Sequence, residues 1–178
     1  MDDIATSCSP LIDQASNPVT WKQHIGGVAA NAAFSAREVT NVDVPIGFCA
    51  ATGCDAVADQ LEKALSDAGL DACLQHLPAC NTGRYTAVMN HDGELYIGLS
   101  DVALAERLDP EQVPLGESTG RCTALLMDAN LSESCLTALA SRAASQSTTL
   151  AAMSVSPVKS RRLLPLASSI DLLFINRR

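Results

Sequence analysis

The clearest pattern of apolar and polar positions lies in the last third of the chain. Apolar runs typical of buried strands alternate there with helical segments, in the order 122–129 (strand), 132–145 (helix), 148–154 (strand) and 170–175 (strand). A second helix is expected between the last two strands, beginning at Ser156-Pro157, because proline is tolerated in a first helical turn. This order predicts parallel strands joined by right-handed crossovers.

The first half of the chain shows weaker versions of the same pattern. A helix with an alanine-rich stripe is predicted from Gly26, followed by a buried strand over Val44–Ala50 and a helix capped by Asp55 and closed by Gly69. Two alternating runs within residues 84–100 surround an Asp-Gly turn and predict a β-hairpin. The predicted fold class is therefore α/β, with a Rossmann-like parallel sheet flanked by helices and a hairpin region. Residues 1–20 show no periodicity and are predicted to be loop, which leaves 21–178 as the domain.

The net charge and the cysteines of the chain argue against several classes of protein. The net charge of −8, from 12 basic and 20 acidic residues, disfavours a nucleic-acid or anionic-membrane surface. The start "MDDIATSC" lacks the apolar region of a signal peptide, and no apolar run reaches the roughly 20 residues of a membrane helix. Seven cysteines without a CxxC pair, beside three histidines, argue against zinc and favour reduced, structural thiols in a cytoplasmic protein.

Polar residues follow the predicted parallel strands where each strand ends. Asp128 and Asn130 follow one strand, Ser154 and Ser156 the next, and Asn176 the last. Ligands of open parallel sheets bind beyond the carboxyl ends of the strands, so these residues are candidates for a ligand site. The alternative is structural, because single residues of this type commonly cap turns or end strands.

Gly26-Gly27, with Asn31 one turn further along, forms a second candidate. Paired glycines let a ligand approach the backbone closely, and a helix start offers free N–H groups. A plain turn is the alternative. The segment is neither a P-loop nor a GxGxxG dinucleotide motif.

Taken in order, these segments resemble the PfkB (ribokinase-like) family of sugar and nucleoside kinases, and within it the pseudouridine kinases most closely. The likeness is carried by "GGVAAN", "ATGCDAVADQLEKAL", "TGRYTAVMNHDGELYIGLSD", "LLMDANLS" and "LLFINRR". It implies that Gly26, Gly27 and Asn31 contact sugar hydroxyls. It also implies that Asn130 lines the phosphoryl-transfer cleft, and that Asn176 is the first residue of the family's Asn-x-x-Glu motif. Apart from the resemblance, Arg84, Tyr85 and Thr86 of the hairpin are also candidates to reach a substrate, with Thr86 assigned to substrate binding.

The family uses ATP and Mg²⁺, but several of its parts are not found in this sequence. The glutamate of Asn-x-x-Glu, the Gly-Ala-Gly-Asp motif with its general base, and a first strand bearing a glycine and a substrate-binding aspartate are expected to be missing. The chain is therefore expected to be a kinase domain truncated before its C-terminal half and catalytically incomplete, so no catalytic residue and no metal ligand are assigned.

Two alternatives to a sugar or nucleoside kinase stay open. The first is a non-catalytic module that binds a sugar, or binds a partner through an exposed sheet edge, a second copy of the chain being one such partner in a homo-oligomer. The second is an unstable fragment, which would expose apolar surface at its last strand. For the kinase and for the non-catalytic module, the expected ligand is a small sugar or nucleoside.

Overall fold

The computed structural model describes residues 1–40, 43–116 and 122–175. Its strands are β1 (Asp2–Ser7), β2 (Val19–His24), β3 (Gly47–Thr52), β4 (Asp71–His76), β5 (Arg84–Met89), β6 (Leu95–Asp101), β7 (Ala124–Asp128), β8 (Thr149–Met153) and β9 (Leu172–Phe174). Its α-helices are α1 (Val28–Val39), α2 (Ala56–Asp67), α3 (Glu133–Ser145) and α4 (Pro157–Ser160), with 3-10 turns at Ala103–Arg107, Pro110–Gln112 and Arg161–Ser169.

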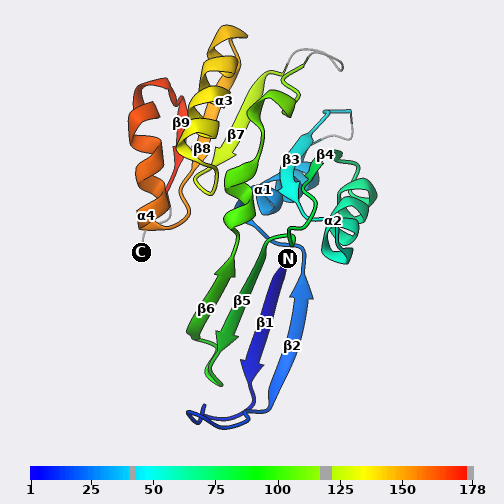
Figure 1. The fold of residues 1–178 in the computed structure, drawn as a ribbon, viewed down its shortest axis with the longest axis vertical. Coiled ribbons are helices and arrows are strands. Elements are labelled where there is room, and N and C mark those ends of the chain that lie inside the picture. The colour runs from blue at the N-terminus through cyan, green and yellow to red at the C-terminus, as the bar shows by residue number, and fades with distance from the viewer. Residues whose placement is uncertain (41–42, 117–121, 176–178) are drawn as a thin grey trace.

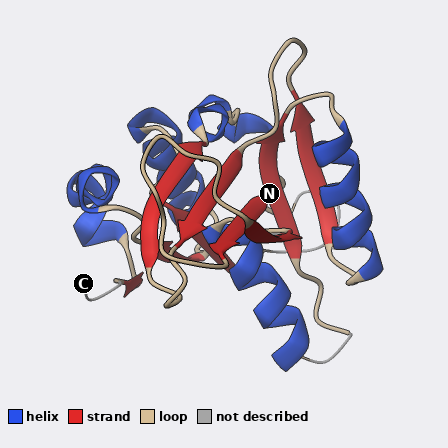
Figure 2. Ribbon diagram, turned by 90° about the horizontal axis from the view of Figure 1, so that it is seen from below, coloured by secondary structure: helices blue, strands red, loops and turns tan. Residues whose placement is uncertain are grey.

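The strands form three sheets, in the orders β2-β1-β5-β6, β3-β4 and β7-β8-β9. The second and third sheets are parallel throughout, whereas the first is mixed, since only its β1–β5 pair is parallel. Figure 1 shows the four-stranded sheet extending away from the helices, and Figure 2 shows the helices around the strands of the other two sheets. The predicted α/β class, the parallel order of β7, β8 and β9, and the β5–β6 hairpin are all confirmed.

Side-chain caps set the starts of three helices where the sequence predicts them. The backbone N–H of Ala58 donates to Asp55 at 3.0 Å, that of Cys135 to the Ser132 hydroxyl at 3.2 Å, and that of Lys159 to the Ser156 hydroxyl at 3.3 Å. Each cap satisfies one of the free amides of a first helical turn. These starts hold the loops that follow β3, β7 and β8.

The prediction of loop for residues 1–20 is wrong for Asp2–Ser7 and for the start of β2. In β1, Asp3, Ala5 and Ser7 are buried, so the buried face of this strand carries small and polar side chains. An apolar pattern could not reveal it. The predicted strand at 44–50 is shifted to Gly47–Thr52, and β4 was not predicted as a separate strand.

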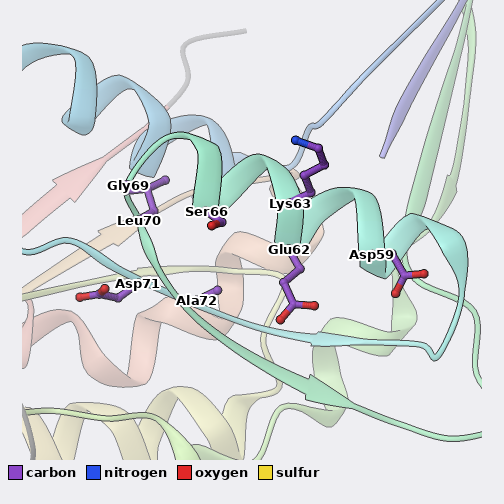
Figure 3. A pocket seen from close by; sticks show the side chains of 8 residues that line it. All are labelled: Asp59, Glu62, Lys63, Ser66, Gly69, Leu70, Asp71 and Ala72. Carbon is purple, nitrogen blue, oxygen red and sulfur yellow. The ribbon is translucent and has the colours of Figure 1, made fainter.

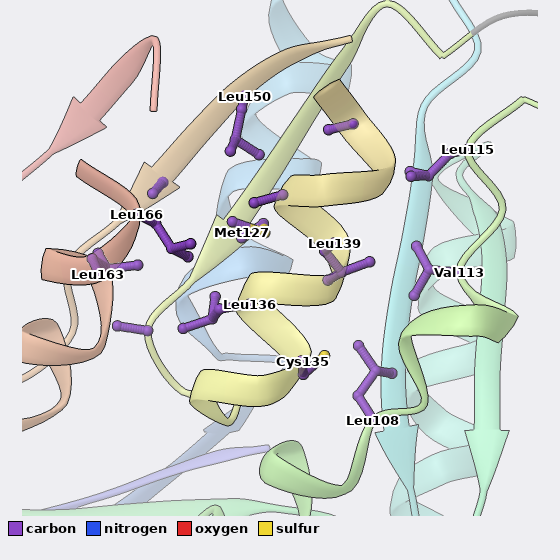
Figure 4. Packing of buried hydrophobic residues seen from close by; sticks show 14 residues of the cluster. Leu108, Val113, Leu115, Met127, Cys135, Leu136, Leu139, Leu150, Leu163 and Leu166 are labelled. Carbon is purple, nitrogen blue, oxygen red and sulfur yellow. The ribbon is translucent and has the colours of Figure 1, made fainter. Parts of the chain in front are cut away.

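The larger core lies where α3 packs on β7 and β8 (Figure 4). Leu136, Ala143, Ala129 and Ala152 are 0% exposed. A smaller core, formed by Ala30, Phe48, Leu61, Leu65 and Leu70, joins α1 and α2 to β3. The chain has few aromatic residues, and leucine and alanine therefore fill most of the space between helices and strands.

The last strand is not buried as predicted. Leu172, Leu173 and Phe174 are each about half exposed, at 54%, 48% and 55%. Within the described part of the chain β9 pairs only with β8, so one of its edges has no neighbouring strand. The expected exposure of apolar surface at this strand is therefore present. Asn176 lies outside the described residues.

Candidate functional site

The first part of the candidate site is the turn that starts α1. Gly27 is the N-cap residue with φ of +108°, a conformation that favours glycine, and a side chain there would meet nothing within 4 Å. The backbone therefore lies open to an approaching molecule at this point. Asn31 lies one turn further along, is exposed, and donates its backbone N–H to the Gly27 carbonyl at 2.9 Å.

An aspartate from β1 lies directly against this turn. A methyl group on Gly26 would overlap the carboxyl group of Asp2, so glycine is required for the close contact. Asp2 is held in place from both sides, because Tyr85 N–H donates to the Met1 carbonyl at 2.9 Å and Asp2 is the register partner of His24. His24 Nε2 lies 4.0 Å from Asp2 Oδ2. Asp2 thus adds an acidic group to the predicted glycine site.

Thr86, a predicted substrate-binding residue, does not lie on the same face of the sheet as Asp2. The register pairs Asp2 with Tyr85 and Asp3 with Thr86, and successive residues of a strand point to opposite faces of a sheet. Thr86 therefore shares a face with Asp3, which is 5% exposed and accepts a hydrogen bond from Gln23 Nε2 at 2.6 Å. Tyr85 is the β5 residue on the Asp2 face.

The second part of the candidate site lies beyond the carboxyl ends of β7 and β8. Asp128 ends β7 and accepts a hydrogen bond from the Asn130 backbone N–H at 2.8 Å. The Asn130 side chain accepts one from Lys159 Nζ at 3.0 Å, and Lys159 follows β8. Ser154 and Ser156 come to the same edge, where Ser156 caps α4. Asn130 is thus part of a polar network, beyond the turn-forming role considered from sequence.

The two parts of the site meet through Asp128. Burial raises the pKa of this carboxyl group, and the effect outweighs the backbone amides of Asn130 and Ala29 and the charge of Lys159, which favour ionisation. Ala29 belongs to the first turn of α1, and α1 packs on β7. The start of α1, with Gly27, therefore lies beside the sheet edge that carries Asp128 and Asn130.

The raised pKa of Asp128 predicts a gain in stability on neutralising the group. Below its ordinary pKa of 3.8 the carboxyl is protonated in both states and burial costs nothing. As the pH rises above that value the unfolded chain ionises first, so folding becomes less favourable until the folded pKa is passed. We expect Asp128→Asn to raise the unfolding midpoint at pH 7, with a gain that shrinks as the pH approaches 3.8.

Thermal unfolding at several pH values measures this gain. Asp67→Asn is the matched control, because Asp67 is 64% exposed in a surface ion pair with Lys63 and should change the midpoint little at any pH. A lower midpoint for Asp128→Asn at pH 7 would show that the contacts of the carboxylate outweigh its burial.

A separate surface depression lies on α2 and the turn that follows it (Figure 3). It is lined by Asp59, Glu62, Lys63, Ser66, Gly69, Leu70, Asp71 and Ala72. None of these belongs to the candidate site, and the mixture of three acids with a lysine is typical of a solvated helix surface. We assign it no function.

Two further features bear on the class of protein. No described helix is long and apolar enough to cross a lipid bilayer. All seven cysteines are free, and burial raises the pKa of the Cys49 thiol to about 12 and that of Cys135 to about 11. These two thiols are therefore poor nucleophiles at neutral pH.

Sequence reasoning missed two residues of the site, Asp2 and Lys159. Asp2 belongs to a strand with no apolar signal, although an acidic residue opening an alternating segment ahead of Gly26-Gly27 was a usable sign. Lys159 follows its strand by several residues and was not considered as a candidate. The position after a parallel strand was again the available signal.

A parallel α/β sheet with polar groups at its carboxyl edge, and a glycine turn and carboxylate beside it, is an arrangement typical of proteins that bind small polar ligands. The family model described as "pfkB family carbohydrate kinase" matches residues 4–178. The chain belongs to this family. A search of curated proteins gave no match.

Solved structures agree with this assignment. A carbohydrate kinase from Agrobacterium tumefaciens is similar with a TM-score of 0.82 and 29% identity, over 97% of this chain and 56% of that one. Adenosine kinase from Anopheles gambiae, in complex with P1,P4-di(adenosine-5) tetraphosphate, is similar with a TM-score of 0.73 and 17% identity. This match covers 98% of this chain and 64% of that one. A putative ribokinase II from E. coli, in complex with ATP and Mg²⁺, has a TM-score of 0.74 and 17% identity, over 98% of this chain and 58% of that one. The chain thus spans little more than half the length of these structures.

Proposed function

We propose that this chain forms the sugar-binding half of a pfkB-type sugar or nucleoside kinase, with a pseudouridine-like C-nucleoside as its ligand. The observation that carries the proposal is the contact of the Asp2 carboxyl with Gly26, beside the open Gly27 backbone and Asn31. A carboxylate accepts hydrogen bonds from vicinal hydroxyls, and the glycines let the sugar reach the backbone amides. The 29% identity to the Agrobacterium carbohydrate kinase supports the same ligand class.

In the reaction proposed for the whole kinase, the primary hydroxyl oxygen of the nucleoside bonds to the γ-phosphorus of ATP. The bond from that phosphorus to the bridging oxygen breaks, ADP leaves, and the hydroxyl proton passes to a base. Resemblance places that base in a Gly-Ala-Gly-Asp motif, which this sequence does not contain. The residues present supply substrate positioning, with Asn130 near the phosphate and Asn176 assigned there by resemblance alone.

The described residues supply no ready-made cluster of metal-binding side chains. No three His, Cys, Asp or Glu side chains among them gather closely enough to hold a metal ion. Mg²⁺ is usually held by one or two carboxylates together with water and substrate phosphates. We therefore derive no step of phosphoryl transfer through a metal bound by these side chains.

A non-catalytic module that binds a sugar or a partner is the second candidate, favoured by the half-exposed apolar residues of β9. Release of ADP by this chain in the presence of ATP and pseudouridine would exclude the second candidate, since a binding module gives none. For either candidate we place the chain in the cytoplasm, where seven free thiols stay reduced.

Replacing the Asp2 carboxylate tests the proposed ligand contact. We expect Asp2→Asn to weaken pseudouridine binding about 10- to 100-fold, because hydrogen bonds to charged groups contribute roughly 1.5–3 kcal/mol. Isothermal titration calorimetry of the purified chain measures the change. Asp13→Asn is the control, because Asp13 lies in the exposed β1–β2 loop, 3.3 Å from the Tyr96 hydroxyl. Equal affinity in Asp2→Asn and wild type would remove Asp2 from the site.

A further inference from the structure

Lys159 is a cation whose charge is not matched by a close carboxylate. Its side chain is half-buried, and lysine is rarely buried unless paired. Its hydrogen-bond partner is the neutral Asn130 Oδ1 atom, at 3.0 Å. Within the described residues its ammonium group forms no salt bridge. An ammonium group has three donors, so two remain for another acceptor.

The neighbouring cation, Arg162, differs from Lys159 because it forms a salt bridge. Its guanidinium donates to the carbonyls of Asn130 and Leu131, at 3.3 and 3.0 Å, and to Glu106 Oε1 at 2.8 Å. Arg162 therefore ties the loop after β7 to the 3-10 turn at Ala103–Arg107 and has its charge matched. Lys159 comes to the same loop from the other side and forms no salt bridge with any of the described residues.

The described residues show no salt bridge between Lys159 and Asp128, the acid whose pKa the charge of Lys159 lowers. Burial acts in the opposite direction and raises the pKa of the Asp128 carboxyl group. The site therefore holds a cation, a neutral amide and a partly buried carboxyl group. Lys159, whose ammonium group has two donors left for another acceptor, is the group of this site that suits an incoming anion.

We propose that Lys159 binds a phosphate group, either the phosphate monoester of a phosphorylated sugar or nucleoside or the terminal phosphate of a polyphosphate. The proposal rests on the proposed function, because the packing of α1 on β7 places this cation beside the turn that is assigned to the sugar. An ammonium group contacts phosphate oxygens as a compact point charge. Lys159 would turn from Asn130 Oδ1 to the phosphate, and Asn130 would then offer its amide N–H groups to the same ligand.

Calorimetric titration with pseudouridine and with pseudouridine 5′-phosphate tests this assignment in wild type, Lys159→Gln and Lys159→Arg. We expect wild type to bind the monophosphate about tenfold more tightly than the nucleoside, at low ionic strength. Lys159→Gln should lose that preference while keeping its affinity for the nucleoside, and Lys159→Arg should retain most of it. Lys63→Gln is the matched control, because Lys63 is 73% exposed in a surface ion pair. A preference that survives in Lys159→Gln overturns the proposal.

A second probe separates this proposal from the proposed function and distinguishes the two phosphate sources. Tripolyphosphate carries no sugar, so it can raise the unfolding midpoint even if the chain binds no nucleoside. A rise in wild type that is absent in Lys159→Gln supports the polyphosphate source and leaves the sugar site to be judged on its own. If neither tripolyphosphate nor the monophosphate binds more tightly to wild type than to Lys159→Gln, the assignment is wrong.

Discussion

Gly26→Ala is expected to weaken pseudouridine binding at least tenfold and to destabilise the folded chain by about 1–3 kcal/mol. The added methyl group would overlap the carboxyl group of Asp2, so that side chain or the α1 turn must move. Either movement separates the carboxylate from the Gly27 backbone, which the proposed site requires together. A tenfold loss corresponds to about 1.4 kcal/mol of binding free energy.

Calorimetric titration and thermal unfolding of the same samples separate the two effects. Gly47→Ala is the matched control, since an added Cβ at Gly47 would meet only the Asp71 carbonyl, at an ordinary 3.8 Å. It should leave affinity unchanged. If a folded Gly26→Ala chain binds the nucleoside as tightly as Gly47→Ala, the ligand does not depend on the Asp2–Gly26 contact.

Leu136→Ala is expected to have the larger effect on stability, lowering the free energy of unfolding by roughly 2–5 kcal/mol. Leu136 is 0% exposed and lies in the core formed by α3 with β7 and β8. Truncation leaves a cavity that this close-packed region can only partly fill. For a chain of this size each kcal/mol shifts the unfolding midpoint by roughly 2–4 °C.

Leu164→Ala provides the comparison for the core variant. Leu164 is 71% exposed, so its truncation should change stability by no more than about 0.5 kcal/mol. Similar midpoints for Leu136→Ala and Leu164→Ala would mean that α3 does not pack on the parallel sheet in solution as the structure shows.

The elements with strong apolar periodicity could be predicted from the sequence. In β7, α3 and β8 the apolar pattern, the Ser132 cap and the β-α-β order all agree, and the structure follows them. The hairpin was predicted for a local reason, because Asn90–Gly93 forms a tight turn with Gly93 at φ of +84°. Local chemistry and pattern were sufficient in both regions.

The remaining elements depend on contacts that a sequence pattern does not show. β1 pairs with β5 from more than eighty positions away, and its buried residues Asp3, Ala5 and Ser7 are too small or polar to stand out. β9 is an apolar run that lies exposed, because burial depends on a neighbouring strand and not on composition. The site was predicted only in part for the same reason. Gly26, Gly27 and Asn31 follow from a local motif, whereas Asp2 reaches them through sheet pairing.

Calorimetric titration of the wild-type chain with pseudouridine tests the central claim most directly, namely that the glycine turn of α1 and the Asp2 carboxylate bind a sugar. Saturable binding of one nucleoside per chain, weakened in Asp2→Asn and unchanged in Asp13→Asn, is the predicted result. A folded chain with a cooperative unfolding transition that binds neither pseudouridine nor ribose would contradict the proposed function.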